Sequence, residues 1–325
     1  MRFVVRRLVL FVGALFGLSV LVFVALRVLP GDVATVMAGL KATPERVAAL
    51  RAQLGLDRPL IVQYGDWLGA LLRGDLGDSA LTGKSVTSQV AQRAQVTFPL
   101  ILIALAVALA VGIPLGCVAT LARRPGVRGF FHVVAIVGGA VPALWSGLLL
   151  ILLFSRGTGL IGLFPSQGFP LDGWTKPGAA LASLVLPALA SGLIVAASLM
   201  RYTRAALGEQ IASGAVDMGM ACGMTRVQAT LRIGLRLATP QLVSVVGLTF
   251  AQMITSVMVV ENLYALPGIG SMLVTDVGNR DLIAVQSELF LLAAFFLTLG
   301  LIVDLLHRAL DPRLAVASDG NEVDR

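Results

Sequence analysis

Charged side chains are scarce in this sequence. Asp, Glu, Lys and Arg make up 13% of its 325 residues, about half of the share that is usual in soluble proteins. Hydrophobic residues make up 57%, and the mean hydropathy is +0.89. This composition excludes an ordinary soluble protein, a disordered chain and a collagen-like repeat. We therefore predict a membrane protein that crosses the bilayer several times.

Cysteine and histidine are rare as well, with two of each. Cys117 lies inside an apolar run and Cys222 in a basic, polar stretch, so their spacing fits neither a disulfide framework nor a zinc site. His132 and His307 belong to no metal-binding pattern. No serine lies in a motif that supplies a base and an orienting group. We expect no metal, no cofactor and no catalytic site in this chain.

Six charge-poor stretches are long enough to cross a hydrocarbon core about 30 Å thick, which takes about 20 residues of helix. They are residues 8–26, 94–122, 129–154, 177–200, 237–260 and 282–303. The first is too long for the apolar part of a cleavable signal peptide, so we expect it to remain as a span. Two glycine pairs, Gly13 with Gly17 and Gly112 with Gly116, have the spacing of close contacts between helices.

The formal net charge of +7 does not indicate nucleic-acid binding, because the basic residues stand at the ends of the apolar stretches. The positive-inside rule accounts for this placement. The short outer loops would keep only Arg156, Lys176 and Arg280. An N-terminus in the cytoplasm places there the other basic residues that flank the spans: Arg2, Arg6, Arg7, Arg123, Arg124, Arg128, Arg201, Arg204, Arg226, Arg232, Arg236, Arg308 and Arg313. We predict that both termini are cytoplasmic.

The spans divide the chain into four regions: residues 1–29 with the first span, an extracytoplasmic region at 30–93, a core of five spans at 94–313, and a cytoplasmic tail at 314–325. In the outer region, Thr43 and Pro44 are typical of the start of a helix. Residues 59–73 favour an amphipathic helix at the outer membrane surface. The outer region either caps the first span or forms a docking surface.

A long cytoplasmic segment, about residues 201–239, connects the fourth and fifth spans. A simple connection needs only a few residues, and the small residues in this one include Gly214, Gly219 and Gly223. We predict a short helix that ends near Gly223, where glycine can adopt the left-handed cap conformation. Small side chains allow close approach to a partner, so we expect an interaction element. The alternative is a loop that only lies on the membrane surface.

Two stretches partly match nucleotide-binding motifs. Residues 78–85 end like a P-loop but begin with Asp78, where the tight turn requires glycine. Residues 157–162 have GxGxxG spacing but follow a membrane span and open no strand-helix-strand unit. We expect neither stretch to bind a nucleotide.

Charged groups inside apolar spans are costly and are therefore candidates for function. Arg27 and Asp304 lie near the ends of spans, where their side chains can reach the headgroups. Glu261 and Glu288 flank the same outer loop. These two carboxylates either line or gate a polar pathway, or they make structural hydrogen bonds.

Four stretches occur in order along the chain: VRRL at 5–8 leading to VLPGD at 28–32, LGLDRPL at 54–60, RGDLGDS at 73–79, and VENLYALPGIG at 260–270. Together they resemble the permease subunits of the peptide and nickel class of ABC importers, particularly the B-type dipeptide or oligopeptide subunit. Val33 stands where that family usually has proline. The resemblance covers nearly the whole chain. It implies an all-α polytopic membrane protein with six transmembrane helices, similar to a type I ABC importer permease.

The resemblance also implies a role for the cytoplasmic segment. Permeases of this kind carry a coupling helix with a fixed glycine, which docks into a groove on the ATPase subunit. The matching stretch is DMGMACG at 217–223, with Gly223 at the fixed glycine. Asp217, Gly219 and Cys222 depart from the usual residues. The residues implied in coupling are Asp217, Met218, Gly219, Ala221, Cys222, Gly223, Met224 and Arg226.

The resemblance further implies a non-catalytic subunit of a prokaryotic cell-membrane importer that forms a translocation pathway for dipeptides or oligopeptides. The implied partners are a second homologous permease, one or two ATPase subunits that bind ATP and Mg²⁺, an extracytoplasmic substrate-binding protein and membrane lipid, with no nucleic acid. One alternative is an ABC importer for nickel or another small solute. Another is a stand-alone secondary transporter, for which only Glu261 and Glu288 offer an ion path and no inverted repeat is visible.

Overall fold

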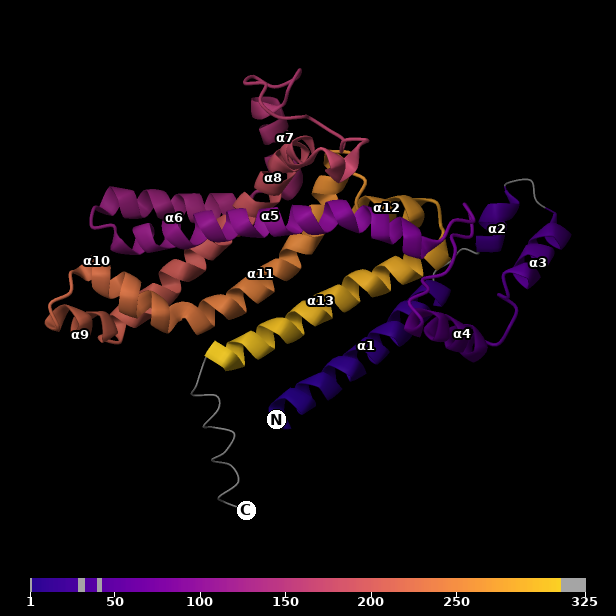
Figure 1. The fold of residues 1–325 in the computed structure, drawn as a ribbon, viewed down its shortest axis with the longest axis horizontal. Helices are drawn as coiled ribbons and strands as arrows, with labels where there is room; N and C mark the ends of the chain where they lie inside the picture. The colour runs from indigo at the N-terminus through magenta and orange to yellow at the C-terminus, as the bar shows by residue number, and fades with distance from the viewer. Residues whose placement is uncertain (1, 29–32, 40–42, 311–325) are drawn as a thin grey trace, which may run out of the picture. The chain divides into compact units, whose positions relative to one another are not determined.

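The computed structural model describes residues 2–28, 33–39 and 43–310. Within these residues every regular element is a helix, apart from two isolated β-bridges (Figure 1). The predicted all-α fold class is confirmed. The motif residues 29–32, Arg313 and the predicted tail at 314–325 lie outside the described residues. The chain divides into two compact units: unit 1 comprises the residues up to 97 together with 267–301, and unit 2 comprises 98–266 together with the residues from 302 onward.

Five helices are long and apolar enough to cross a membrane: α1 (Arg2–Val28), α5 (Val86–Leu121), α8 (Pro177–Ala212), α11 (Leu235–Leu263) and α13 (Leu282–Leu310). They correspond to five of the six predicted stretches. Three of them extend well beyond the predicted apolar limits: α5 begins eight residues early, α8 ends twelve residues late, and α13 ends seven residues late. The span predicted at 129–154 is not one straight helix.

That third stretch is broken into α6 (Pro125–Ala140) and α7 (Ala143–Phe154), which meet at an angle of 105°. Pro142 causes the break, because its ring disfavours the helical conformation for the residue before it. Val141 accordingly is extended, with φ −71° and ψ 123°. Counted as one broken span, the pair brings the number of candidate spans to six.

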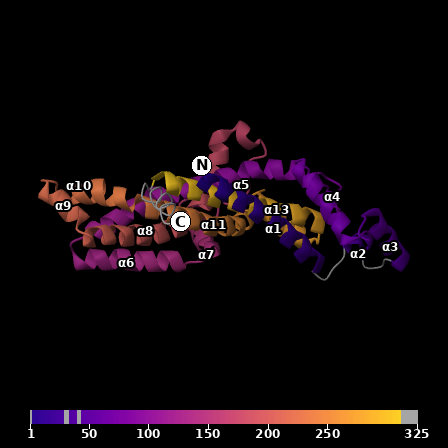
Figure 2. The same ribbon diagram turned by 90° about the horizontal axis from the view of Figure 1, so that it is seen from below.

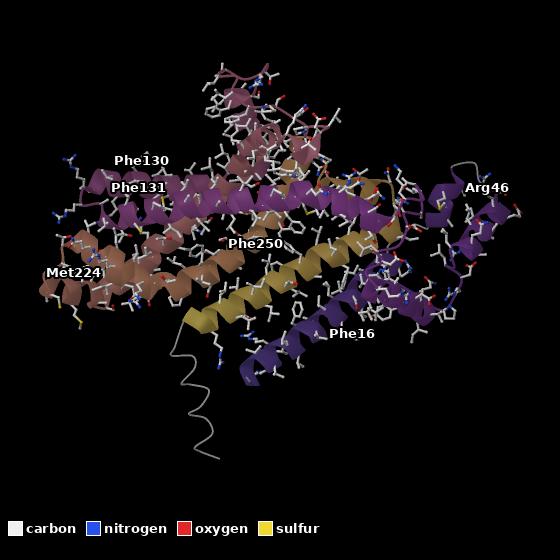
Figure 3. All side chains as sticks on the ribbon, viewed as in Figure 1. Phe16, Arg46, Phe130, Phe131, Met224 and Phe250 are labelled. Atoms are coloured by element: carbon white, nitrogen blue, oxygen red, sulfur yellow. The ribbon has the colours of Figure 1, made fainter. Side chains whose placement is uncertain are left out.

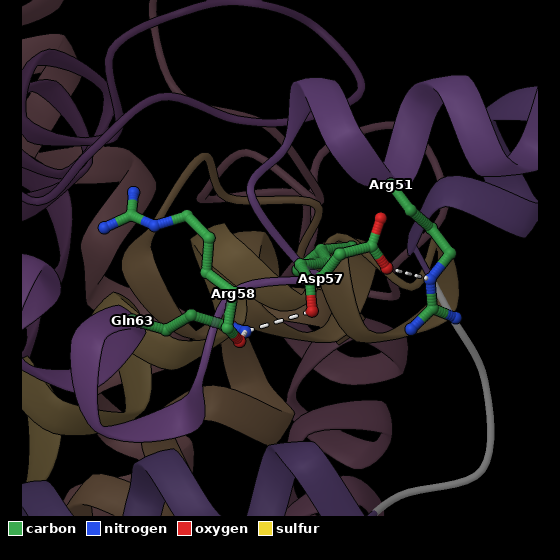
Figure 4. A network of polar contacts seen from close by, with 5 residues as sticks. Arg51, Asp57, Arg58 and Gln63 are labelled. Carbon is green, nitrogen blue, oxygen red and sulfur yellow. Dashed lines mark hydrogen bonds and ion pairs between the residues drawn. The ribbon is translucent and has the colours of Figure 1, made fainter.

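Unit 1 contains the outer helices α2 (Val33–Ala38), α3 (Pro44–Gln53) and α4 (Leu60–Leu72). The predicted start of α3 is confirmed, since the Thr43 hydroxyl accepts a hydrogen bond from the Arg46 amide at 3.4 Å. Polar contacts hold the link between α3 and α4 (Figure 4). Arg51 pairs with Asp57 at 3.1 Å, and the side-chain amide of Gln63 donates to the Leu56 carbonyl at 3.0 Å.

The amphipathic character predicted for residues 59–73 is confirmed in α4. Tyr64 and Trp67 face the unit: their rings lie 5.3 and 6.3 Å from the Phe23 ring of α1. By contrast Ile61 and Leu72 are 80% and 81% exposed. One edge of the apolar face therefore packs against α1, and the other edge is uncovered.

Asp281 joins two distant segments of unit 1. Its carboxylate is buried and accepts hydrogen bonds from the Ser79 hydroxyl at 2.6 Å and the Ala80 and Leu81 amides at 3.3 and 3.4 Å. It also caps α13 by accepting from the Ala284 amide at 3.3 Å. The stretch 78–85 that ends like a P-loop is thus a closed turn fastened to the start of α13.

Unit 2 is assembled around α8, and glycines permit the closest helix contacts. A Cβ atom on Gly116 would lie 2.5 Å from the Thr203 Cβ, and one on Gly112 would lie 2.7 Å from the Ala196 carbonyl oxygen. The predicted role of the pair Gly112 and Gly116 in close packing is confirmed. Gly13 and Gly17 of α1 have no such neighbour within 4 Å among the described residues.

The GxGxxG stretch at 157–162 folds back onto the end of α7. The Leu160 amide donates to the Leu152 carbonyl at 3.0 Å, and the Arg156 amide donates to the Phe164 carbonyl at 2.6 Å. A Cβ on Gly159 would lie 2.5 Å from the Ser155 nitrogen, so the local turn itself requires this glycine. The glycines serve a compact connection that leads to a short turn, η1 (Gly173–Thr175), and then to α8.

Candidate functional site

The cytoplasmic segment predicted at 201–239 is mostly helical rather than a loop. Helix α8 continues to Ala212, and only short turns separate it from α9 (Ala215–Ala221) and α10 (Arg226–Ala229). A π-helical turn, η2 (Thr230–Gly234), then leads directly into α11. Helices α9 and α10 lie together at one end of unit 2 in both views (Figures 1 and 2).

Gly223 ends α9 in the manner that the sequence predicts. Its φ is +87°, a value that side-chain-bearing residues rarely adopt. The Gly223 amide donates to the Met220 carbonyl at 2.9 Å, and the Met224 amide donates to the Gly219 carbonyl at 3.2 Å. This pair of bonds is a Schellman motif, which satisfies the last carbonyls of the helix.

The chain starts α10 at once with a capping box. The Thr225 hydroxyl accepts from the Gln228 amide at 3.3 Å, and the Gln228 side chain accepts from the Thr225 amide at 3.1 Å. Because both turns are closed by hydrogen bonds, α9 and α10 form a defined helical hairpin.

Gly219 fixes how α9 packs. A Cβ at this position would lie 2.6 Å from Ile233 Cδ1 and 3.1 Å from the Ala229 Cβ. Val216 is buried beside it. The departure from the usual family residue at Gly219 therefore has a packing reason, because a larger residue would displace the Ile233 side chain and crowd Ala229. Gly219 is thus a packing residue and does not face outward.

The other residues predicted for coupling are presented at the surface. Met218 is 72% exposed, and Figure 3 shows Met224 at the tip of the hairpin. Met220, Val227 and Leu231 add further exposed apolar side chains. Asp217, Ala221, Cys222, Gly223 and Arg226 are exposed, whereas Met224 is half-buried. We call this surface, made by the exposed residues of 217–231, the hairpin surface. Exposed methionine at such density is typical of protein-binding surfaces.

Glu261 and Glu288 are both fully buried, but they belong to different units. Glu261 lies at the end of α11 in unit 2, where its backbone carbonyl accepts from the Leu266 amide at 2.8 Å. Glu288 lies in the second turn of α13 in unit 1. Although they flank the same outer segment of the sequence, each carboxylate has to be considered in its own unit.

Glu288 shares its buried site with two other acids and one arginine. The charged groups acting on it are Asp276 of α12 (Ile269–Gly278), Asp281 and Arg93. Arg93 directs its guanidinium to the Gly268 carbonyl at 3.3 Å and to a serine hydroxyl, and Asp281 is an acid. The carboxyl groups of Glu288 and Asp276 interact through a side-chain hydrogen bond, so two acids share this buried position.

We expect Glu288→Gln to raise the thermal stability of the protein. Two acids that share a buried site repel each other when charged, and glutamine replaces one of them by a neutral amide that can donate to Asp276. The unfolding temperature of the purified protein should therefore rise by several degrees. The matched control is Glu209→Gln, which neutralises an exposed acid of α8 and should leave the transition in place. A lower transition for Glu288→Gln would contradict this account.

Two residues of the outer segment have structural roles that the predictions from the sequence do not include. One is Asp281, whose position just before an apolar helix is a recognisable N-cap signal. The other is Tyr264, which is buried and donates a hydrogen bond from its hydroxyl to the Gly147 carbonyl at 3.0 Å. Burial raises the pKa of Tyr264, so the phenol remains a donor. Its own carbonyl accepts from the Gly168 amide at 2.8 Å, and Tyr264 thus ties α11 to α7 and to the following connection.

Comparisons with known proteins agree with the architecture. Residues 112–316 match the family described as binding-protein-dependent transport system inner membrane component, and residues 1–100 match the N-terminal region of the same kind of protein. The chain is 33% identical over 317 residues to a putative peptide transport system permease protein of Brucella abortus, covering 96% of this chain and 98% of the relative.

A second relative is the glutathione transport system permease protein of Escherichia coli, which is 32% identical over 314 residues. The alignment covers 97% of this chain and 99% of the relative. Among solved structures, the methionine ABC transporter MetNI in its inward-facing conformation matches with a TM-score of 0.53 and 17% identity. That match covers 68% of this chain and 96% of the other chain, and it supports the fold. The chain therefore belongs to the family of inner-membrane components of binding-protein-dependent transport systems, the permease subunits of ABC importers.

Proposed function

We propose that this chain pairs with a second permease of the same family and that the two enclose a path for short peptides across a prokaryotic cell membrane. Separate ATPase subunits bind ATP and Mg²⁺ and drive the cycle, and an extracytoplasmic binding protein delivers the substrate. Peptides are favoured because the similar proteins of Brucella abortus and Escherichia coli are named for peptide and glutathione transport. Nickel and other small solutes are therefore the weaker alternative.

The observation that carries this proposal is the hairpin surface. It exposes apolar and sulfur-containing side chains on a structure that is closed at both turns by hydrogen bonds. A surface that is both ordered and apolar suits a rigid partner groove, because little conformational freedom is lost on docking. In this proposal the groove belongs to the ATPase subunit.

Movement of the ATPase reaches the spans through the packing of α9. Gly219 brings α9 against Ala229 and Ile233, and η2 continues without interruption into α11. A displacement of α9 therefore acts on α11 directly and on α8 through the turn at Ser213 and Gly214. Two arrangements of this packed bundle, with different affinities for the ATPase and for the binding protein, are what alternating access requires.

In this proposal both termini are cytoplasmic. The basic residues beside α5, α6, α8 and α10 support this orientation, because basic residues concentrate on the cytoplasmic side of a membrane protein. The proposal also assigns residues 54–79, which include α4, to the reception of the binding protein. Glu288 contributes to the pathway or its gate, and the expected stability cost of its carboxylate supports a functional reason for its presence. Glu261 keeps the same proposed role in unit 2.

The natural cysteines allow a direct test. Cys222 is exposed on the hairpin surface, whereas Cys117 is buried in α5. A short photo-activated crosslinker attached to Cys222 in native membranes should capture a P-loop ATPase, identified by mass spectrometry after gentle detergent purification. A second six-span permease should co-purify. Cys222→Ser should abolish the crosslink.

Two results would overturn the proposal. One is co-purification of an ATPase that never crosslinks to Cys222, which would move the docking site elsewhere. The other is a chain that purifies alone and takes up solute in liposomes without ATP, which would favour a secondary transporter. Peptide uptake by the reconstituted complex, with competition by nickel salts or glutathione, tests the substrate class separately.

A further inference from the structure

Three arginines lie where α5 meets α6: Arg123 and Arg124 in the connecting turn, and Arg128 in the first turn of α6. We call them the arginine triad. All three are exposed, and no acidic side chain pairs with any of them among the described residues. The sequence contains no Asp or Glu at all between Asp78 and Asp172. The triad is therefore a concentration of positive charge that the chain itself does not neutralise nearby.

The backbone holds the triad in a defined place. Pro125 occupies the first position of α6, and Arg124 before it is extended, with φ −78° and ψ 127°. The two flanking helices are both packed against α8: a Cβ on Gly116 of α5 would touch Thr203, and a Cβ on Gly138 of α6 would lie 2.9 Å from the Ala197 Cβ. The arginines thus lie in a short turn between two packed helices and in the first turn of the second helix.

An uncovered apolar stripe begins at the triad and runs along α6. Val127, Phe130 and Val137 lie on one side of the helix at intervals of three and seven residues and are exposed. Phe130 is 63% exposed, and Figure 3 shows it next to Phe131. A stripe of this kind on a membrane helix faces acyl chains, which places the arginines at its end at the level of the headgroups.

We propose that the arginine triad binds the phosphate groups of anionic phospholipids. A guanidinium group matches a phosphate with two parallel hydrogen bonds, and each basic residue near an anionic membrane surface contributes about 1 kcal/mol to binding. The adjoining stripe accommodates the acyl chains of the same lipid. The combination of charge and apolar surface favours a lipid over an acidic protein surface, because an acidic protein surface would not cover the apolar stripe.

The test compares the unmodified full-length protein with a triad variant and a control variant, each with any subunits that purify with it. Each is placed in nanodiscs of phosphatidylcholine that contain increasing fractions of phosphatidylglycerol. Native mass spectrometry counts the phosphatidylglycerol molecules retained. The triad variant carries three substitutions together: Arg123→Gln, Arg124→Gln and Arg128→Gln. It should need about 100-fold more phosphatidylglycerol for equal lipid retention, the product of three contributions of about fivefold each. The matched control removes three exposed charges elsewhere: Arg46→Gln, Arg73→Gln, Lys84→Gln.

The proposal predicts that the control retains phosphatidylglycerol like the unmodified chain and that inorganic phosphate at millimolar concentration does not displace the lipid. Equal retention by the triad variant and the unmodified chain would overturn it. Displacement by inorganic phosphate would also overturn it, because the site would then be a free-anion site. Loss of ATPase subunits from the triad variant with unchanged lipid retention would assign the arginines to a protein contact instead.

Discussion

Replacing Gly223 by valine or proline is expected to reduce ATP-driven uptake at least tenfold while the chain stays in the membrane. Gly223 has φ +87° and completes the Schellman motif that ends α9. A left-handed conformation costs a β-branched residue about 1–2 kcal/mol or more, and proline cannot adopt it because its ring holds φ near −65°. The hairpin would rearrange and present its apolar residues in the wrong geometry. Uptake and ATP hydrolysis, measured together in proteoliposomes, should become uncoupled.

The matched control is Gly223→Asn, since asparagine tolerates the left-handed region better than other residues with side chains. No atom lies within 4 Å of a Cβ at this position, so bulk alone does not interfere inside the chain. Asparagine should retain most of the uptake. Normal uptake by the proline variant would show that the hairpin surface does not transmit the ATPase movement.

Gly116→Leu is expected to destabilise unit 2 strongly by forcing two packed helices apart. The first side-chain atom would lie 2.5 Å from the Thr203 Cβ and 2.9 Å from the Met200 carbonyl oxygen. Backbone cannot rotate away as a flexible side chain can, so α5 and α8 must separate. Overpacking of this kind costs about 3 kcal/mol, which corresponds to a fall of roughly 6–10 °C in the thermal transition. Thermal unfolding in detergent would measure it.

The control for this effect is Gly208→Ala in α8. A Cβ at Gly208 meets nothing within 4 Å, and alanine is favoured over glycine in a helix by about 0.5–1 kcal/mol. Gly208→Ala should therefore raise the transition slightly. If Gly116→Leu and Gly208→Ala shifted the transition equally, the tight contact between α5 and α8 would not exist in solution.

Much of the fold follows from local chemistry. Long charge-poor stretches identify the spans because the bilayer core admits only apolar helices. The starts and ends of short elements are also readable in the sequence, since Thr43 before Pro44 and Gly223 after α9 are capping signals that act within one turn of helix. These signals involve residues close in the sequence, and they need no knowledge of the partners across the fold.

The extent of the helices is harder to predict. The predicted limits at 94 and 200 follow the apolar residues, but α5 and α8 continue into polar sequence because helical hydrogen bonds do not depend on apolar side chains. The break at Val141 and Pro142 is present in the sequence as a proline inside an apolar run. Its angle of 105° depends on the packing of α6 and α7 against α8.

By itself, the sequence determined that this protein is a polytopic α-helical membrane protein, and the motifs at 5–8 with 28–32, 54–60, 73–79 and 260–270 placed it among the ABC importer permeases. Only the tertiary structure decided which glycines are contacts, that Asp281 fastens residues 79–81 to α13, and that Glu261 and Glu288 belong to separate units. The physical reason is the separation along the chain of the residues that interact. Hydropathy and capping act between neighbours in the chain, whereas the buried carboxylate of Asp281 finds donors among residues 200 to 202 positions away.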